Sequence, residues 1–206
     1  METNKIREYI LVKDNFRHAK LEEIGCYDYN GELRYTDHIY NMLNDVFRMD
    51  SLITEVSYVI AFDHNKVSKG ICKVGQGTLS ETPTPMQPIF TFLLLTGASS
   101  FIIVHNHISD MPNASSSDQM ITKTTEMLAT EFDIEFIGHM IINPCGYIID
   151  GGIMDGIVAE LDEDGDIYSW NSKEDNMPFN DDETIHITSE NMYEVAKMLR
   201  KKAEKR

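Results

Sequence analysis

A short apolar run that ends in two closely spaced histidines constrains this chain more than any other feature. Residues 101–104 are aromatic and β-branched or aliphatic, and His105, Asn106 and His107 follow directly. A run of this length and composition predicts a buried strand. Because alternate side chains of a strand share one face, both imidazoles can point to the same side and converge on one cation at the strand end.

A carboxylate follows at a spacing that suits the same cation. Asp118 lies in a Ser115-x-x-Asp118 pattern, a capping box that predicts a helix from Ser115 to about residue 132. Two imidazoles and one carboxylate leave a fourth tetrahedral position for water, as in a catalytic zinc site. Paired histidines also occur as core residues, and Asp118 also suits helix capping alone, so the spacing favours a metal site without excluding these structural roles.

The elements around this stretch alternate between helices and strands. Apolar residues at helical spacing predict two helices, over 36–49 and 86–96, and Thr36 or Asp37 can cap the first. Apolar and alternating runs predict strands over 55–63, 70–75, 101–104, 133–142 and 147–149. With the helix that begins at Ser115, this order predicts an α/β (α+β) fold.

The two ends of the chain have a different character. Residues 5–13 predict a strand, and Asn30-Gly31 between aromatic residues predicts a two-residue hairpin turn. After Gly151-Gly152 the sequence becomes acidic, with a hairpin before 167–170, a flexible linker over 171–184 and a helix over 189–202. We therefore divide the chain into an N-terminal β-element (1–35), a core domain (36–150) and an acidic C-terminal extension (151–206).

Charge and composition limit the classes of function. The 206 residues carry a net charge of −16, with 34 acidic side chains against 18 lysines and arginines, which argues against nucleic acid as a partner. No apolar run approaches the ~20 residues of a membrane span, and the N-terminus lacks a signal peptide's apolar core. Three cysteines without a CxxC pair indicate reduced thiols, so we expect a cytoplasmic protein; the oligomeric state stays open.

The histidine-rich stretch resembles the signature of one known family. Within the stretch, the matching positions are His105-Asn106-His107, Ser109, Pro112, Ser115, Asp118 and Thr122. Two further matches, Gly77-Thr78 and Gly97-Ala98, lie before it. Over about residues 36–150, the chain resembles the RadC-like branch of the JAB/MPN (JAMM) zinc metallopeptidases. The resemblance implies a JAB/MPN, cytidine-deaminase-like core with a central mixed sheet flanked by helices.

The resemblance also implies a role for each site residue. His105, His107 and Asp118 correspond to the ligands of one zinc ion per chain, with water as the fourth ligand. Glu55 corresponds to the glutamate that activates this water, although an acid at the start of a strand is unremarkable by itself. Ser115 corresponds to the serine that hydrogen-bonds the developing oxyanion.

Some positions depart from the family pattern without removing a ligand. Ile108 replaces a proline, Asp110 replaces a glycine, and Met86-Gln87-Pro88 stands where RadC proteins commonly carry Pro-Arg-Glu. These changes bear on loop rigidity, on charge beside the metal and on the substrate groove. His139 stands where the family often has a histidine, and we expect it to support the site or the core rather than to be a ligand.

The resulting hypothesis is a zinc-dependent metallopeptidase that hydrolyses a peptide or isopeptide bond of a protein or peptide substrate. The alternative is a catalytically inactive MPN-type interaction module, whose acidic extension docks a basic partner. A weaker third idea is that the extension mimics nucleic acid. The sequence does not identify the substrate, because a fold is compatible with many functions.

Overall fold

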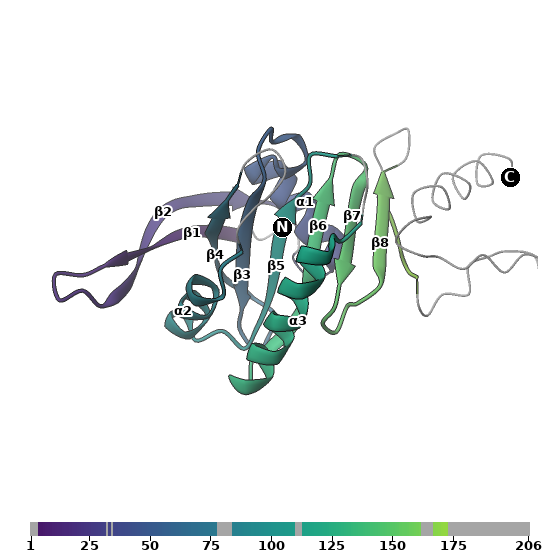
Figure 1. The fold of residues 1–206 in the computed structure, drawn as a ribbon. Helices are drawn as coiled ribbons and strands as arrows, with labels where there is room; N and C mark the ends of the chain where they lie inside the picture. The colour runs from purple at the N-terminus through teal and green to yellow at the C-terminus, as the bar shows by residue number, and fades with distance from the viewer. Residues whose placement is uncertain are drawn as a thin grey trace, which may run out of the picture.

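The computed structural model describes residues 4–31, 33, 35–77, 84–109, 113–161 and 167–172. Within these residues, one mixed sheet has the strand order β2-β1-β4-β3-β5-β6-β7-β8-β9, and helices cover both of its faces (Figure 1). The elements are β1 (Asn4–Lys13), β2 (Ala19–Tyr29), α1 (Thr36–Phe47), the 3₁₀ turn η1 (Met49–Ser51), β3 (Val56–Phe62), β4 (Ser68–Gln76), α2 (Met86–Thr96), β5 (Ser100–Asn106), α3 (Ser116–Glu131), β6 (Glu135–Asn143), β7 (Gly146–Asp150), β8 (Ile157–Leu161) and β9 (Ile167–Asn171). The predicted α/β fold with a central mixed sheet is therefore confirmed.

The central strands are apolar on both faces because helices cover both. Tyr58 and Ile60 of β3 belong to the core on the α1 side, whereas Val59 and Ala61 belong to the core beneath α2 and α3. This alternation follows from the two-residue period of a strand. It makes β3 and β5 continuous apolar runs in the sequence, which is why both strands could be predicted.

The site lies where β5 gives way to α3. Strands β5 and β6 are parallel neighbours, and α3 connects them across the face of the sheet (Figure 1). The carboxyl end of β5 and the amino end of α3 consequently meet at one edge of the sheet. Open α/β sheets commonly bind ligands at such an edge.

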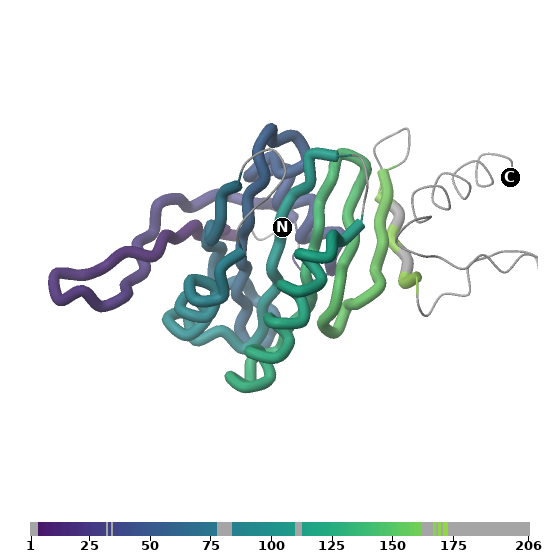
Figure 2. Tube along the Cα trace, viewed as in Figure 1, coloured from purple at the N-terminus to yellow at the C-terminus, as the bar shows by residue number. Residues whose placement is uncertain are grey.

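The predicted hairpin turn at Asn30-Gly31 is wrong. Strand β2 runs up to Tyr29 and pairs antiparallel with β1, and this hairpin extends beyond the body of the sheet (Figure 2). Its turn lies at residues 14–18, where Asp14 Oδ1 accepts the main-chain N–H groups of Phe16 and His18, both at 2.8 Å. A long ladder with β1 binds more main-chain groups than a short local hairpin, so the aromatic alternation before Asn30 serves β2.

The predicted cap of α1 is also wrong. Tyr35 occupies the N-cap position and makes no side-chain capping bond. The Tyr147 hydroxyl lies 2.8 Å from Thr36 Oγ1 and also contacts Asp37, so both expected capping side chains bind β7 instead. A tertiary contact here replaces the local one.

The outer strands extend the sheet of the core. β4 pairs with β3, and β9 pairs with β8 in the hairpin that the sequence predicted before residues 167–170. The predicted helix over 189–202 and nearly all of the linker over 171–184 lie outside the described residues. The division into 1–35, 36–150 and 151–206 stays a prediction. No helix within the described residues is long and apolar enough to cross a membrane.

Candidate metal site

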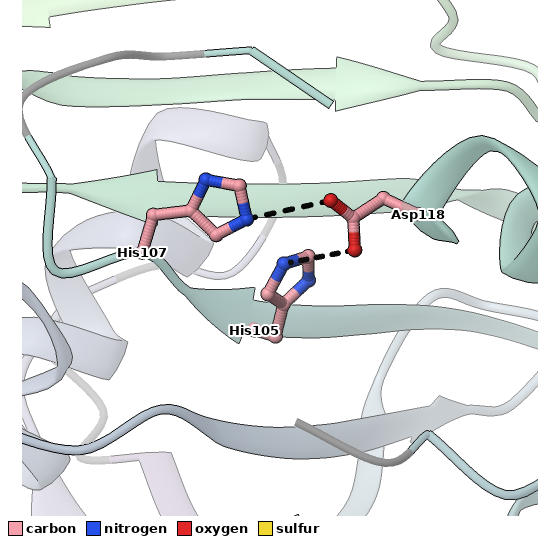
Figure 3. Close-up of side chains that lie close together, drawn as sticks. All are labelled: His105, His107 and Asp118. Atoms are coloured by element: carbon pink, nitrogen blue, oxygen red, sulfur yellow. Dashed lines mark ion pairs between the residues drawn. The ribbon is translucent and has the colours of Figure 1, made fainter. Parts of the chain in front are cut away.

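Three side chains from two adjacent elements converge at the end of β5. His105 belongs to β5, His107 follows that strand directly, and Asp118 lies in the first turn of α3. One nitrogen or oxygen atom from each lies within 4.8 Å of the others, and no other group of this kind occurs among the described residues. Figure 3 shows both imidazoles pointing towards the carboxylate.

The distances suit a tetrahedral cation. His105 Nε2 lies 3.3 Å from Asp118 Oδ1, and His107 Nε2 lies 3.4 Å from Asp118 Oδ2. In a tetrahedral site with bonds of about 2.0–2.1 Å, ligand atoms are about 3.3–3.4 Å apart. These contacts are longer than good hydrogen bonds between charged groups, which measure about 2.7–2.9 Å. The three side chains therefore fit a metal ion better than they fit each other.

The first turn of α3 holds the carboxylate in place. The predicted capping box is confirmed: the Asp118 N–H donates to Ser115 Oγ, and the Ser115 N–H donates to Asp118 Oδ2 at 2.8 Å. Ser115 Oγ also donates to Asp118 Oδ2, at 2.6 Å. Burial alone would raise the pKa of the Asp118 carboxyl, but His107, His105 and the Ser115 donors outweigh it and hold that pKa well below its usual value.

A buried chain of hydrogen bonds connects the first histidine to the same helix. His105 Nδ1 lies 2.7 Å from His139 Nε2, and His139 Nδ1 lies 3.0 Å from Thr122 Oγ1. Thr122 Oγ1 in turn donates to the main-chain carbonyl of Asp118, at 2.9 Å. This geometry agrees with the expectation that His139 supports the site. The two bonds of the His139 ring join β6 to β5 and to α3.

The direction of this chain follows from counting hydrogens. Thr122 has one hydroxyl hydrogen, and its bond to the Asp118 carbonyl uses it. His139 Nδ1 must then donate to Thr122, which leaves His139 Nε2 as an acceptor, so His105 Nδ1 must carry the hydrogen between the two rings. In neutral His105, Nε2 is left with a lone pair that faces the Asp118 carboxylate. Two electron-rich atoms that face each other repel, so this arrangement favours a cation between them.

Burial keeps both rings of this chain neutral. It lowers the pKa of His105 well below the usual value, with further lowering by His139 and His107, and Asp118 opposes the shift. It also lowers the pKa of His139 to about 4. A protonated His105 is therefore disfavoured as the bridge to the carboxylate, and the cluster could instead hold a metal ion.

The two predicted catalytic side chains lie at the same edge of the sheet. Glu55 directly precedes β3 and is only 8% exposed, and it stands outside the three-residue cluster. Ser115 is the N-cap of α3, and its hydroxyl is bonded to Asp118. Their catalytic roles stay predictions. Asp110 and Pro112 of the motif lie outside the described residues, as does Thr78.

Sequence reasoning did not find the chain that supports His105. His139 is 34 residues from His105 and 17 residues from Thr122, so no local spacing connects them.

Met86, where the sequence departs from the family pattern, packs its sulfur 3.5 Å from the Thr125 hydroxyl, between α2 and α3.

The fold and the site define a class of protein: a mixed α/β domain with a His-His-Asp cluster that could hold a metal ion. A family model described as RadC-like JAB domain matches residues 33–149, more than half of the chain. The chain belongs to this RadC-like JAB family.

Relatives in several bacteria have similar sequences over the same domain. A UPF0758 protein of Clostridium acetobutylicum is 29% identical over 118 residues, which cover 57% of this chain and 47% of the relative. A UPF0758 protein of Flavobacterium johnsoniae is 31% identical over 93 residues, covering 43% of this chain and 41% of the relative. One of Aromatoleum aromaticum is 27% identical over 96 residues, covering 46% and 42%. The chain thus spans less than half the length of these relatives.

Proposed function

We propose that this domain is a zinc-dependent metallohydrolase that cleaves a peptide or isopeptide bond in a protein or peptide substrate. The observation that carries the proposal is the buried hydrogen-bonded chain from His105 through His139 and Thr122 to the Asp118 carbonyl, with His105 Nε2 facing the Asp118 carboxylate at 3.3 Å. From this chain we infer that His105 Nε2 carries a lone pair and not a hydrogen. Such a site favours a cation. Membership of the RadC-like JAB family supports the same function.

Each site residue has a role in this proposal. His105, His107 and Asp118 would hold the ion, and two imidazoles with one carboxylate suit zinc. When bound, zinc polarises a carbonyl and lowers the pKa of water towards ~7. Glu55 would take a proton from the attacking water and pass it to the leaving amine. Ser115 would donate its hydroxyl hydrogen to the oxyanion, after exchanging its present bond to Asp118 Oδ2.

Metal content tests the site itself. Elemental analysis of the purified protein should find about one zinc per chain, as a site with three protein ligands requires. The His105→Ala/His107→Ala variant should lose it. His64→Ala is the matched control, because His64 is exposed in the turn after β3. A wild-type protein that takes up no zinc on reconstitution would overturn the proposal.

Turnover tests the mechanism. A library of internally quenched peptides and isopeptide-linked pairs should contain a substrate that the zinc-loaded protein cleaves. Glu55→Gln should keep its zinc and lose about 10²–10⁴-fold in kcat, the usual contribution of a general base. Full activity in Glu55→Gln would show that this mechanism is wrong. Zinc uptake without any cleavage would instead support the inactive interaction module.

A further inference from the structure

The ladder between β3 and β5 ends beside the metal site. Its last pair is Ser57↔His105. If the same antiparallel register continued for two more residues on each strand, Glu55 would lie opposite His107. Side chains opposite each other in such a register have Cβ atoms about 4.5–5.5 Å apart. The position of Glu55 therefore depends on how the chain just before β3 is held against the end of β5.

The side chain of Asn106 holds that segment where main-chain pairing stops. Its Oδ1 accepts the N–H of Val56 at 2.8 Å, and its Nδ2 donates to the carbonyl of Thr54 at 3.3 Å. These two bonds fix the main chain at the residues just before and just after Glu55. A third bond, from the Gly77 N–H to the Glu55 carbonyl at 2.9 Å, fixes the residue between them.

Asn106 does this from the side of the sheet that faces away from the histidines. Val104 belongs to the core on the α1 side, and Ile103 belongs to the core beneath α2 and α3. By alternation, His105 shares the face of Ile103 and Asn106 shares the face of Val104. The Asn106 side chain is 1% exposed, so water does not compete for its bonds. It acts through the main chain and not through the ion.

We propose that Asn106 is a positioning residue, whose side-chain amide clamps the main chain on both sides of Glu55 and so sets the Glu55 carboxylate beside the metal ligands. This inference rests on the proposed function, in which Glu55 is the general base. An amide is required because it offers one acceptor and one donor from the same group. Aspartate keeps the acceptor alone, and leucine offers neither.

Asn106→Leu is the principal test, with Ser100→Ala at the other end of β5 as the matched buried control. In Asn106→Leu, the Val56 amide should exchange with solvent at least about tenfold faster by NMR. Zinc affinity should change far less than the roughly 10–100-fold loss that follows removal of a ligand's hydrogen-bond partner. With a cleavable substrate, kcat should fall about 10²-fold while KM stays unchanged.

A double variant separates positioning from general structural damage. If Asn106 acts through Glu55, Asn106→Leu/Glu55→Gln should lose no more kcat than Glu55→Gln alone. The visible spectrum of the cobalt-loaded protein gives the same comparison without a substrate: both single variants should alter the bands, and the double variant should match Glu55→Gln. Additive changes, or a Val56 amide that exchanges as slowly as in the wild type, would overturn the inference.

Asn106→Asp serves if the leucine variant does not fold. It keeps the acceptor for Val56, so that amide should stay protected, and only the bond to the Thr54 carbonyl should be lost. Fast exchange at Val56 in Asn106→Asp would contradict the clamp. Failure of the proposed function is distinguishable, because a protein without hydrolytic activity, or without bound metal, still reports the exchange rate of the Val56 amide.

Discussion

Thr122 has a single hydroxyl hydrogen, and the direction in which it points decides the protonation pattern of the site. Its bond to the Asp118 carbonyl makes His139 a donor at Nδ1 and leaves the lone pair of His105 Nε2 facing the carboxylate. A fully buried histidine is usually assigned to packing. Here the His139 ring also orients His105, a candidate ligand. The hydrogen bond at the second ring nitrogen of a metal-binding imidazole sets its orientation and its tautomer, and His139 makes that bond to His105 Nδ1.

We predict that Thr122→Val lowers zinc affinity by about tenfold, because His139 loses its acceptor and the tautomer of His105 is no longer enforced. A chelator competition titration at neutral pH measures this. Thr124→Val is the control: Thr124 makes the same kind of bond, to the Met120 carbonyl at 2.8 Å, on the exposed side of α3. Equal zinc affinity in the two variants would contradict a role of Thr122 in the site.

At the scale of elements, two glycines with positive φ are required for different reasons. Gly97 ends α2 with φ of 60°, and a Cβ there would have no heavy atom within 4 Å. Gly146 starts β7 with φ of 146°, and its Cβ would lie 2.0 Å from the Ala159 carbonyl of β8. The first glycine is required by backbone conformation alone, and the second also by the close approach of a neighbouring strand.

We predict that Gly97→Ala costs about 1 kcal/mol of unfolding free energy, the strain of a left-handed alanine. Gly146→Ala should cost more than about 3 kcal/mol, because β8 has to move away from β7. Urea denaturation of both variants measures the difference. A Gly146→Ala variant as stable as Gly97→Ala would show that β8 is not held as closely as described.

At the scale of the whole molecule, the two cores on either side of the sheet enclose several weak acids. Burial raises the pKa of the Cys72 thiol to about 12, from a usual value of 9.0. It raises the pKa of Tyr40 to about 12, from 10.0, and raises that of Tyr58 further. Tyr147 is raised as well, by burial and by its contact with Asp37. All four groups are protonated in the folded state well above their usual titration range.

We predict that the folded state loses stability at alkaline pH. These four groups bind their protons more tightly in the folded state than in the unfolded state. Their contribution to the unfolding free energy is therefore intact below their unfolded-state pKa values, and it is lost as the pH rises towards their folded-state pKa values. The unfolding free energy should fall by roughly 4–5 kcal/mol between about pH 8 and about pH 10.5, as urea midpoints can measure. Tyr58→Phe should reduce this dependence and Tyr35→Phe, at an exposed site, should not. A flat profile would contradict the burial of these groups.

The candidate site could be predicted where its residues lie close together in the sequence. His105, His107 and the capping box around Asp118 occupy one strand–loop–helix segment, so alternation and capping rules bring them together. The central strands and helices were predicted for the same reason. The local rules failed at Asn30-Gly31 and at the start of α1, where pairing with β1 and the Tyr147 hydroxyl outweighed a local turn and a local cap.

The sequence by itself determined the fold class, the central elements and the three candidate ligands, because hydrophobic period and capping act over a few residues. A supporting role was expected for His139, but only the tertiary structure decided which atoms the supporting side chains bind. His139, Thr122 and Asn106 act on residues brought near by sheet register and by the packing of α3 on β6. Such contacts join positions far apart in the chain, and no local pattern specifies the directions of their hydrogen bonds.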